Sequence, residues 1–220
     1  MAGRKRILCF GDSLTWGWMP ISEVVPTTRY PFEQRWTGVA AAQLGENFEI
    51  IEEGLSGRTT DVDDPTDPRL NGSAYLPAAL ATHLPLDLVI LQIGTNDTKT
   101  YFHRSAYDIA LGMSKLLVQV GTSAGGVGTA YPAPRALVIA PPPLGSMADP
   151  WLQATFEGAQ AKSRELASHY EALAQFFKVD FLNAGEFLTT DGVDGIHLTA
   201  QNNIALGNAI AEKVKAILSR

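Results

Sequence analysis

Short apolar runs rich in β-branched residues recur along this chain, separated by longer segments with helical spacing. Five such runs are typical of β-strands and lie at 6–10, 48–52, 86–93, 136–140 and 179–182. The third run is almost entirely apolar, as expected of a strand that helices cover on both faces. Strands that alternate with helices in this way predict an α/β fold around a parallel sheet.

Capping signals mark several of the helices between these strands. Ser105 and Asp108 have the spacing of a capping box, for a helix that runs through about residue 120. Thr199 is expected to cap the last helix, which carries one apolar stripe. Gly45 stands where a left-handed cap would end an earlier helix.

Composition limits the kind of protein this can be. The 220 residues fit a single domain spanning 1–220, and the lone Cys9 cannot form an intrachain disulfide. A net charge of −6 disfavours nucleic acid and anionic membranes as partners. The apolar run after Arg6 stops at Gly11, too early for a signal peptide, and no membrane span is visible. We therefore expect a cytoplasmic protein.

The first predicted strand runs into Gly-Asp-Ser-Leu at 11–14, which places Ser13 at its carboxyl end. Open parallel sheets form their ligand crevices at that edge. A serine needs a histidine base, oriented by a third group, before it can act as a nucleophile. His197 lies in a glycine-rich loop three residues after Asp194, so that carboxylate could fix the imidazole. The other histidines, His83, His103 and His169, are interpreted as surface or cap residues.

An attacked carbonyl also needs donors for its developing oxyanion. Asn96, in Gly-Thr-Asn-Asp after the third strand, could supply its side-chain amide. Gly57, after the second strand, could supply an unobstructed backbone N–H, and the N–H of Ser13 would be a third donor. Taken singly, each motif is more often an ordinary turn. Their joint occurrence at successive strand ends favours chemistry, although Thr15 rules out the Gly-x-Ser-x-Gly elbow of α/β-hydrolases.

With these motifs the sequence resembles the GDSL or SGNH hydrolase family, whose Ser, Gly, Asn and His match Ser13, Gly57, Asn96 and His197. The segments 10–17, 53–60 and 63–72 look like its bacterial arylesterase and acyltransferase branch. The resemblance implies a flavodoxin-like three-layer α/β/α fold with a central five-stranded parallel sheet. It also implies hydrolysis of short-chain and aryl esters, acyl transfer to alcohols or peroxide, and a homo-oligomer, expected to be an octamer.

The residues near the serine and histidine suggest an acyl pocket. Our hypothesis is that Trp16, Trp18, Met19 and Ile196 form a restricted apolar wall, with ordinary core or interface packing as the alternative. The acidic segment 61–67 lacks the pattern of a calcium loop, so we expect neither metal nor cofactor. Its carboxylates are expected to pair with nearby arginines, which are Arg35, Arg58 and Arg69.

Other functions remain open at this stage. A carbohydrate O-acetylesterase or a thioesterase would use the same residues, and a non-catalytic binding protein could keep the fold. In the catalytic interpretation Ser13 attacks the ester, His197 transfers its proton, and Asp194 orients His197. Activity should then decline as falling pH protonates the imidazole.

Overall fold

The computed structural model describes residues 3–219 and contains a five-stranded sheet in which every neighbouring pair is parallel. The strands lie in the order β2-β1-β3-β4-β5. Their bounds are β1 Lys5–Gly11, β2 Phe48–Gly54, β3 Leu88–Gln92, β4 Arg135–Ala140 and β5 Asp180–Asn183. The predicted α/β class and all five predicted strands are confirmed.

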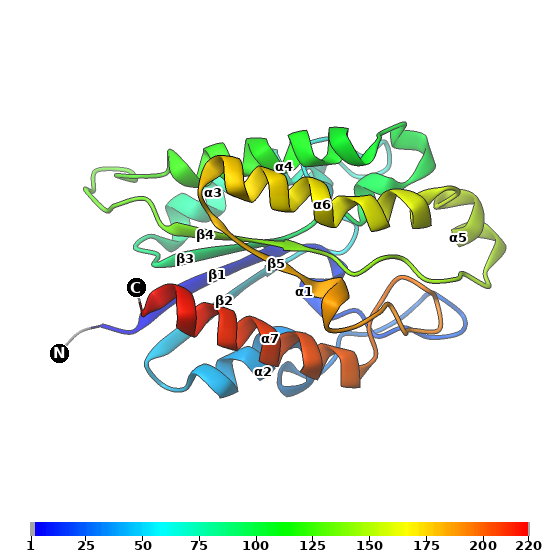
Figure 1. The fold of residues 1–220 in the computed structure, drawn as a ribbon, viewed down its shortest axis with the longest axis horizontal. Helices are drawn as coiled ribbons and strands as arrows, with labels where there is room; N and C mark the ends of the chain where they lie inside the picture. The colour runs from blue at the N-terminus through cyan, green and yellow to red at the C-terminus, as the bar shows by residue number, and fades with distance from the viewer. Residues whose placement is uncertain (1–2, 220) are drawn as a thin grey trace.

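Helices cover both faces of this sheet, giving three layers (Figure 1). On one face lie α3, α4 and α6, and on the other lie α2 and α7. The helices are α1 Ser13–Trp16, α2 Trp36–Leu44, α3 Gly72–His83, α4 Ala106–Gly121, α5 Pro150–Thr155, α6 Ala159–Phe177 and α7 Ala200–Leu218. The structure therefore has the flavodoxin-like arrangement that the resemblance implied.

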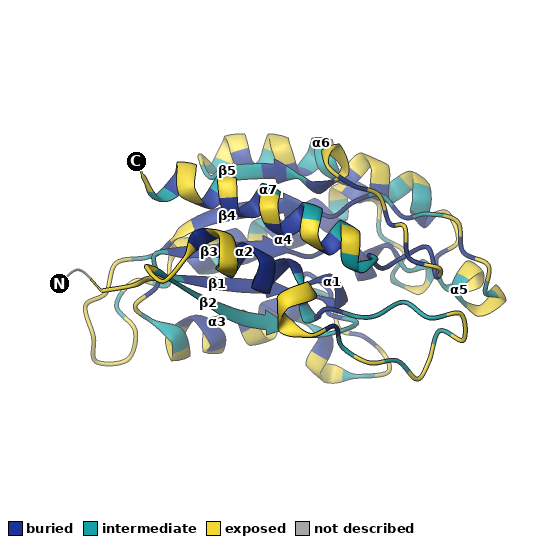
Figure 2. Cartoon of the chain, turned by 90° about the horizontal axis from the view of Figure 1, so that it is seen from below, coloured by how far each residue is buried: buried dark blue, intermediate teal, exposed yellow. Residues whose placement is uncertain are grey.

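The two cores follow from the alternation of side chains along each strand. In β1, Leu8 and Phe10 enter the core beneath α3, α4 and α6, whereas Ile7 and Cys9 enter the core beneath α2 and α7. The inner strands are buried on both faces, whereas the edge strand β2 is only half-buried (Figure 2). This difference explains why the inner strands are the more continuously apolar in sequence.

The predicted helix caps are confirmed at two of three positions. Ser105 and Asp108 form both hydrogen bonds of a capping box at the start of α4. The side chain of Thr199 accepts the N–H of Asn202 and caps α7. Gly45 does end α2, but with φ 80° and ψ −175° it is not in the left-handed helical conformation. A turn follows, closed by the N–H of Phe48 on the carbonyl oxygen of Gly45 at 3.1 Å, and leads the chain into β2.

Strand order also sets where a site can form. The chain leaves β1 to build β2 on one side and then returns to build β3 on the other, so the direction of winding reverses between β1 and β3. Crevices in such sheets open at the carboxyl ends of the two strands that flank this switch point. Ser13 lies two residues after the end of β1, and Asn96 lies in the loop after β3, so both lie at this place in the fold.

Candidate active site

Ser13 is held at the sheet edge by a tight strand-to-helix turn. The carboxylate of Asp12 accepts the N–H of Leu14 at 3.0 Å and caps α1, so Ser13 is the first residue of that short helix. Gly11 allows this turn because a Cβ there would lie 2.2 Å from Oγ1 of Thr15. The Ser13 side chain therefore leaves the strand at a fixed position.

The loop that precedes α7 brings a histidine to this serine. Nε2 of His197 lies 2.9 Å from Oγ of Ser13, a residue 184 positions earlier in the chain. Nδ1 of His197 lies 2.7 Å from Oδ2 of Asp194. All three residues are buried, with 5%, 8% and 4% of Ser13, His197 and Asp194 exposed. The three residues expected to form a catalytic triad are therefore connected in the expected order.

Asp194 is also tied to the backbone of its own loop. Its Oδ1 accepts the N–H groups of Ile196 and His197, each at 2.9 Å. Gly195 makes this turn possible with φ +72°, and a Cβ there would lie 2.3 Å from the carbonyl oxygen of Ser146. Burial favours a higher pKa for Asp194, but its contacts with His197 and the backbone N–H groups hold the pKa below the usual value. Asp194 is thus a charged partner for the imidazole.

The expected oxyanion donors lie on loops that are hydrogen-bonded to one another. Nδ2 of Asn96 donates to the carbonyl oxygen of Arg58 at 3.1 Å, which joins the loop after β3 to the loop after β2. The N–H of Leu55 and Nη1 of Arg58 both donate to the carbonyl oxygen of Gly11, at 3.1 and 2.9 Å. Gly57 lies inside this connected loop with φ +89°. The ends of the three strands β1, β2 and β3 therefore form one hydrogen-bonded unit.

Arg58 was expected to pair with a carboxylate, and that prediction is wrong. Its guanidinium donates to the carbonyl oxygens of Gly11 and Glu53 and stacks over the ring of Phe10 at 4.2 Å. Burial lowers the pKa of Arg58 to about 10. The prediction was right for Arg69, which binds Asp67. Arg35 also binds a carboxylate, but that carboxylate belongs to Glu52 in β2 and not to the acidic segment 61–67.

Asp97 is a structural residue of the site that sequence analysis did not single out. It is completely buried and accepts hydrogen bonds from the N–H and hydroxyl of Thr60 and from Nη1 of Arg104, the last at 2.8 Å. Burial raises its pKa to about 6, although Thr60 and Arg104 act in the opposite direction. In the sequence, the position directly after Asn96 was the one indication of a role for Asp97, because its contact with Thr60 spans 37 positions of the chain.

The predicted pocket residues lie in different environments. The ring of Trp18 stacks on His197 with a centroid distance of 5.0 Å, and Trp16 lies 6.2 Å from Trp18. Met19 is half-buried, and its N–H donates to the carbonyl oxygen of Thr28. Ile196 is buried in a small apolar cluster whose other members are Leu144, Met147, Phe156 and Ala159. The structure therefore places Trp18, of these four residues, in direct contact with the histidine.

Two of the remaining histidines have structural contacts elsewhere. Nε2 of His83 lies 2.8 Å from Oε1 of Glu53, and the ring of His169 meets Tyr107 edge-on. Among residues 3–219, no group of three or more His, Cys, Asp or Glu side chains is arranged to hold a metal ion. Within the same range, no helix is both long enough and apolar enough to cross a membrane.

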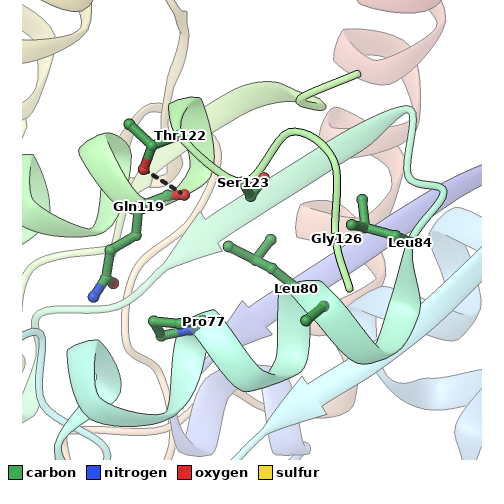
Figure 3. A pocket seen from close by; sticks show the side chains of 8 residues that line it. Pro77, Leu80, Leu84, Gln119, Thr122, Ser123 and Gly126 are labelled. Carbon is green, nitrogen blue, oxygen red and sulfur yellow. Dashed lines mark hydrogen bonds between the residues drawn. The ribbon is translucent and has the colours of Figure 1, made fainter. Parts of the chain in front are cut away.

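A cavity of about 180 Å³ between α3 and α4 is separate from this site (Figure 3). Its walls include Leu80 and Leu84 at the end of α3 and Gln119 and Thr122 at the end of α4. The ends of these helices lead into β3 and β4, so the cavity lies at the amino ends of the strands. Ser13 lies at the opposite, carboxyl edge.

Ser13 is buried, and its hydroxyl contacts a histidine that binds a carboxylate at the switch point of a parallel sheet. This arrangement defines the class of serine hydrolases. Residues 9–202 match the GDSL-like lipase/acylhydrolase family. The chain belongs to this family and is an esterase within it. A comparison with curated proteins found no match.

Several solved structures are similar to this chain. It is 64% identical to Est24, a carbohydrate acetylesterase from Sinorhizobium meliloti, with a TM-score of 0.97 over 97% of this chain and 100% of that one. It is 65% identical to the native aryl esterase of M. smegmatis, with a TM-score of 0.96 over 96% of this chain and 99% of that one. A carbohydrate acetylesterase family member from S. meliloti is 35% identical, with a TM-score of 0.88 over 98% and 100% of the two chains.

Proposed function

We propose that this esterase cleaves short-chain and aryl carboxylic esters through an acyl-enzyme on Ser13. The observation that carries the proposal is the unbroken path from Oγ of Ser13 to Nε2 of His197 at 2.9 Å and from Nδ1 to Asp194 at 2.7 Å. In this mechanism His197 takes the Ser13 proton as the hydroxyl attacks the carbonyl, then gives it to the departing alcohol. Asp194, held as a carboxylate, orients the ring and stabilises the imidazolium.

Three donors are proposed for the oxyanion of the tetrahedral intermediate. They are the backbone N–H groups of Ser13 and Gly57 and the side-chain amide of Asn96. The bond from Asn96 to the Arg58 carbonyl supports this role because it fixes the amide before substrate arrives and leaves its second N–H for the oxyanion. Such preorganised donors need no reorganisation during the reaction.

The acyl-enzyme is then resolved by water, an alcohol or hydrogen peroxide. Ser13 and His197 are both more than nine-tenths buried, which supports a site that limits water and raises the share of acyl transfer. The same burial favours short acyl groups over long ones. If Trp16 forms part of the acyl pocket, Trp16→Ala should broaden the acyl-chain preference, and an unchanged preference would remove it from the pocket.

The similarity to Est24 supports a second candidate, deacetylation of carbohydrates. An acetylated sugar differs from an aryl ester in its alcohol part, which leaves with a proton from His197 in either case. Specificity constants measured side by side on phenyl acetate and on acetylated sugars would separate the two.

A homo-oligomer, expected to be an octamer, is a further part of the proposal. Light scattering measures the oligomeric state, and a monomer would contradict this part.

Labelling of Ser13 by a fluorophosphonate tests the proposed function directly. The wild-type protein and Ser168→Ala, which alters an exposed serine on α6, should both be labelled at Ser13. Ser13→Ala should not be labelled and should lose ester hydrolysis. Absence of label on folded wild-type protein would favour the non-catalytic alternative.

A further inference from the structure

The hydrogen bonds of the His197 ring hold its edge and support neither of its faces. Asp194 binds Nδ1 and Ser13 binds Nε2. Rotation of the ring about its Cβ–Cγ bond is therefore opposed only by the bending of these two hydrogen bonds. A flat group against one face of the ring would remove this freedom.

Trp18 supplies such a group. Its ring lies nearly parallel to that of His197, with an interplanar angle of 17° and a centroid distance of 5.0 Å. Its indole Nε1 is buried and has no hydrogen-bond acceptor among residues 3–219. An unpaired buried N–H is unfavourable, so the ring is placed there by packing rather than by a hydrogen bond of its own.

The backbone of Trp18 is fixed to the nucleophile residue itself. The N–H groups of Gly17 and Trp18 both donate to the carbonyl oxygen of Ser13, at 2.9 and 3.0 Å. Gly17 adopts φ +90° to end α1, and its own carbonyl oxygen accepts the N–H of Tyr30 at 2.8 Å. The backbone of Ser13 thus anchors Trp18, the residue whose ring stacks on His197.

Further contacts of the indole extend away from His197 along the chain to Trp16 and Arg29. Trp16 lies at 6.2 Å from Trp18, and the guanidinium of Arg29 lies over Trp16 at 5.6 Å. Arg29 is itself held by Glu52 at 2.9 Å. The stack is therefore part of a chain of contacts that runs from β2 to His197.

We propose that Trp18 is a positioning residue for His197, which keeps the imidazole in line with Ser13 and favours the imidazolium formed during attack. This rests on the proposed function, because it requires His197 to act as the base. An aromatic face attracts a cation more than it attracts the neutral ring. The stack therefore stabilises the transition state more than the resting state, which raises kcat and leaves KM nearly unchanged.

Paired substitutions test this proposal. Trp18→Leu removes the flat ring, and we expect kcat on 4-nitrophenyl acetate to fall about tenfold with KM changed less than about twofold. Trp18→Phe keeps a flat ring and loses only the indole N–H, so kcat should stay within about threefold of wild type. The loss in the leucine variant should be equal for acetate and butyrate esters. Trp151→Leu, at a tryptophan that is 79% exposed on α5, is the matched control and should leave kcat unchanged.

Two other kinetic results would overturn the positioning role of Trp18. A loss that lies in KM and grows with acyl length would make Trp18 a pocket wall and overturn the proposal. Equal losses in the leucine and phenylalanine variants would assign the effect to the indole N–H, which also overturns it. Trp18→Met provides a second non-aromatic variant if circular dichroism shows that the leucine variant does not fold.

The controls also separate this proposal from the proposed function. If wild-type protein takes the fluorophosphonate label and Trp18→Leu keeps full kcat, the positioning role alone is wrong. If folded wild-type protein takes no label and hydrolyses no ester, the proposed function fails and the positioning role fails with it.

Discussion

The carboxylate of Asp97 accepts the backbone N–H of Thr60 at 3.0 and 3.1 Å, and this contact joins the loop after β2 to the loop after β3. These loops carry Gly57 and Asn96, two of the proposed oxyanion donors. The hydroxyl of Thr60 and Nη1 of Arg104, a residue just before α4, also donate to the same carboxylate. The spacing of the donors therefore depends on a buried ion pair outside the site itself.

Asp97→Asn should weaken both folding and catalysis. The amide turns an N–H group toward donors and takes from Arg104 its fully buried charged partner, so the free energy of unfolding should fall by about 3 kcal/mol. The kcat/KM for a short ester should fall at least about tenfold as the donors lose their spacing. Urea denaturation and steady-state kinetics measure the two effects. Asp61→Asn alters a more exposed partner of the same arginine, at 2.8 Å, and should do much less. Equal effects would show that the Arg104 charge matters and that the Thr60 contact does not.

Asn96→Ala removes a proposed oxyanion donor from a folded protein. We expect turnover to fall by about 10²- to 10³-fold, as happens when one such donor is lost. Loss of the bond to the Arg58 carbonyl should lower the free energy of unfolding by only about 1 kcal/mol. Gln119→Ala is a suitable control, because it removes an amide-to-carbonyl bond of 2.8 Å to Ser73 beside the cavity of Figure 3. A loss below tenfold would exclude Asn96 from the mechanism.

Asp194→Asn should preserve the conformation of its loop and strongly reduce catalysis. The amide oxygen can still accept the N–H groups of Ile196 and His197, so unfolding should change little. Its NH₂ group, however, would face Nδ1 of His197 and favour the tautomer whose Nε2 carries the proton. That nitrogen could no longer accept the Ser13 proton, and kcat should fall about 10⁴-fold. Fluorophosphonate labelling rates measure this loss, and a rate near that of wild type would contradict it.

Asp12 makes folding stability depend on pH. Burial raises its pKa to about 7 from an ordinary value of 3.8, although the Leu14 N–H acts in the opposite direction. Between these two values the folded state binds more protons than the unfolded chain, so this contribution to stability is complete below pH 3.8 and is lost as pH rises through 7.

Asp12→Asn should remove that dependence. Asparagine is neutral at every pH and can still accept the Leu14 N–H, so the variant should match wild type only below pH 3.8. Its stability relative to wild type should rise by about 2 to 3 kcal/mol between pH 5 and pH 8. Urea denaturation at the two pH values measures the difference. Parallel pH curves for the two proteins would show that Asp12 is ionised in both states.

The layered fold was predictable because its signal is local. Burial of the inner strands on both faces requires continuous apolar runs, and 86–93 and 136–140 read as strands for that reason. The ends of the strands were predicted less accurately than the strands themselves. The strand expected at 86–93 is regular only over Leu88–Gln92. The N–H of Asp87 still donates to the carbonyl oxygen of Arg6 at 2.9 Å, but the N–H of Arg6 donates to the Asp87 carboxylate, so the regular backbone ladder begins one residue later. Gly45 likewise ends its helix, but the path into β2 determines its backbone conformation.

The candidate site was predictable in its residue types and partly in its contacts. Ser13, Asn96 and His197 were identifiable because each follows or precedes a recognisable element and only certain side chains can perform the chemistry. Arg58 was assigned a carboxylate partner because charge is visible in a sequence, whereas the carbonyl oxygens that it binds are not.

The sequence alone determined the alternating elements, the order of the motifs and the nature of the groups that could meet at the sheet edge. Only the tertiary structure decided that Trp18 lies on the face of His197, that Ile196 packs into a separate cluster, and that Asp97 joins two loops. The physical reason is distance along the chain. Periodicity and capping act over a few residues, whereas these contacts depend on loops that fold across the sheet, as Ser13 and His197 show across 184 positions.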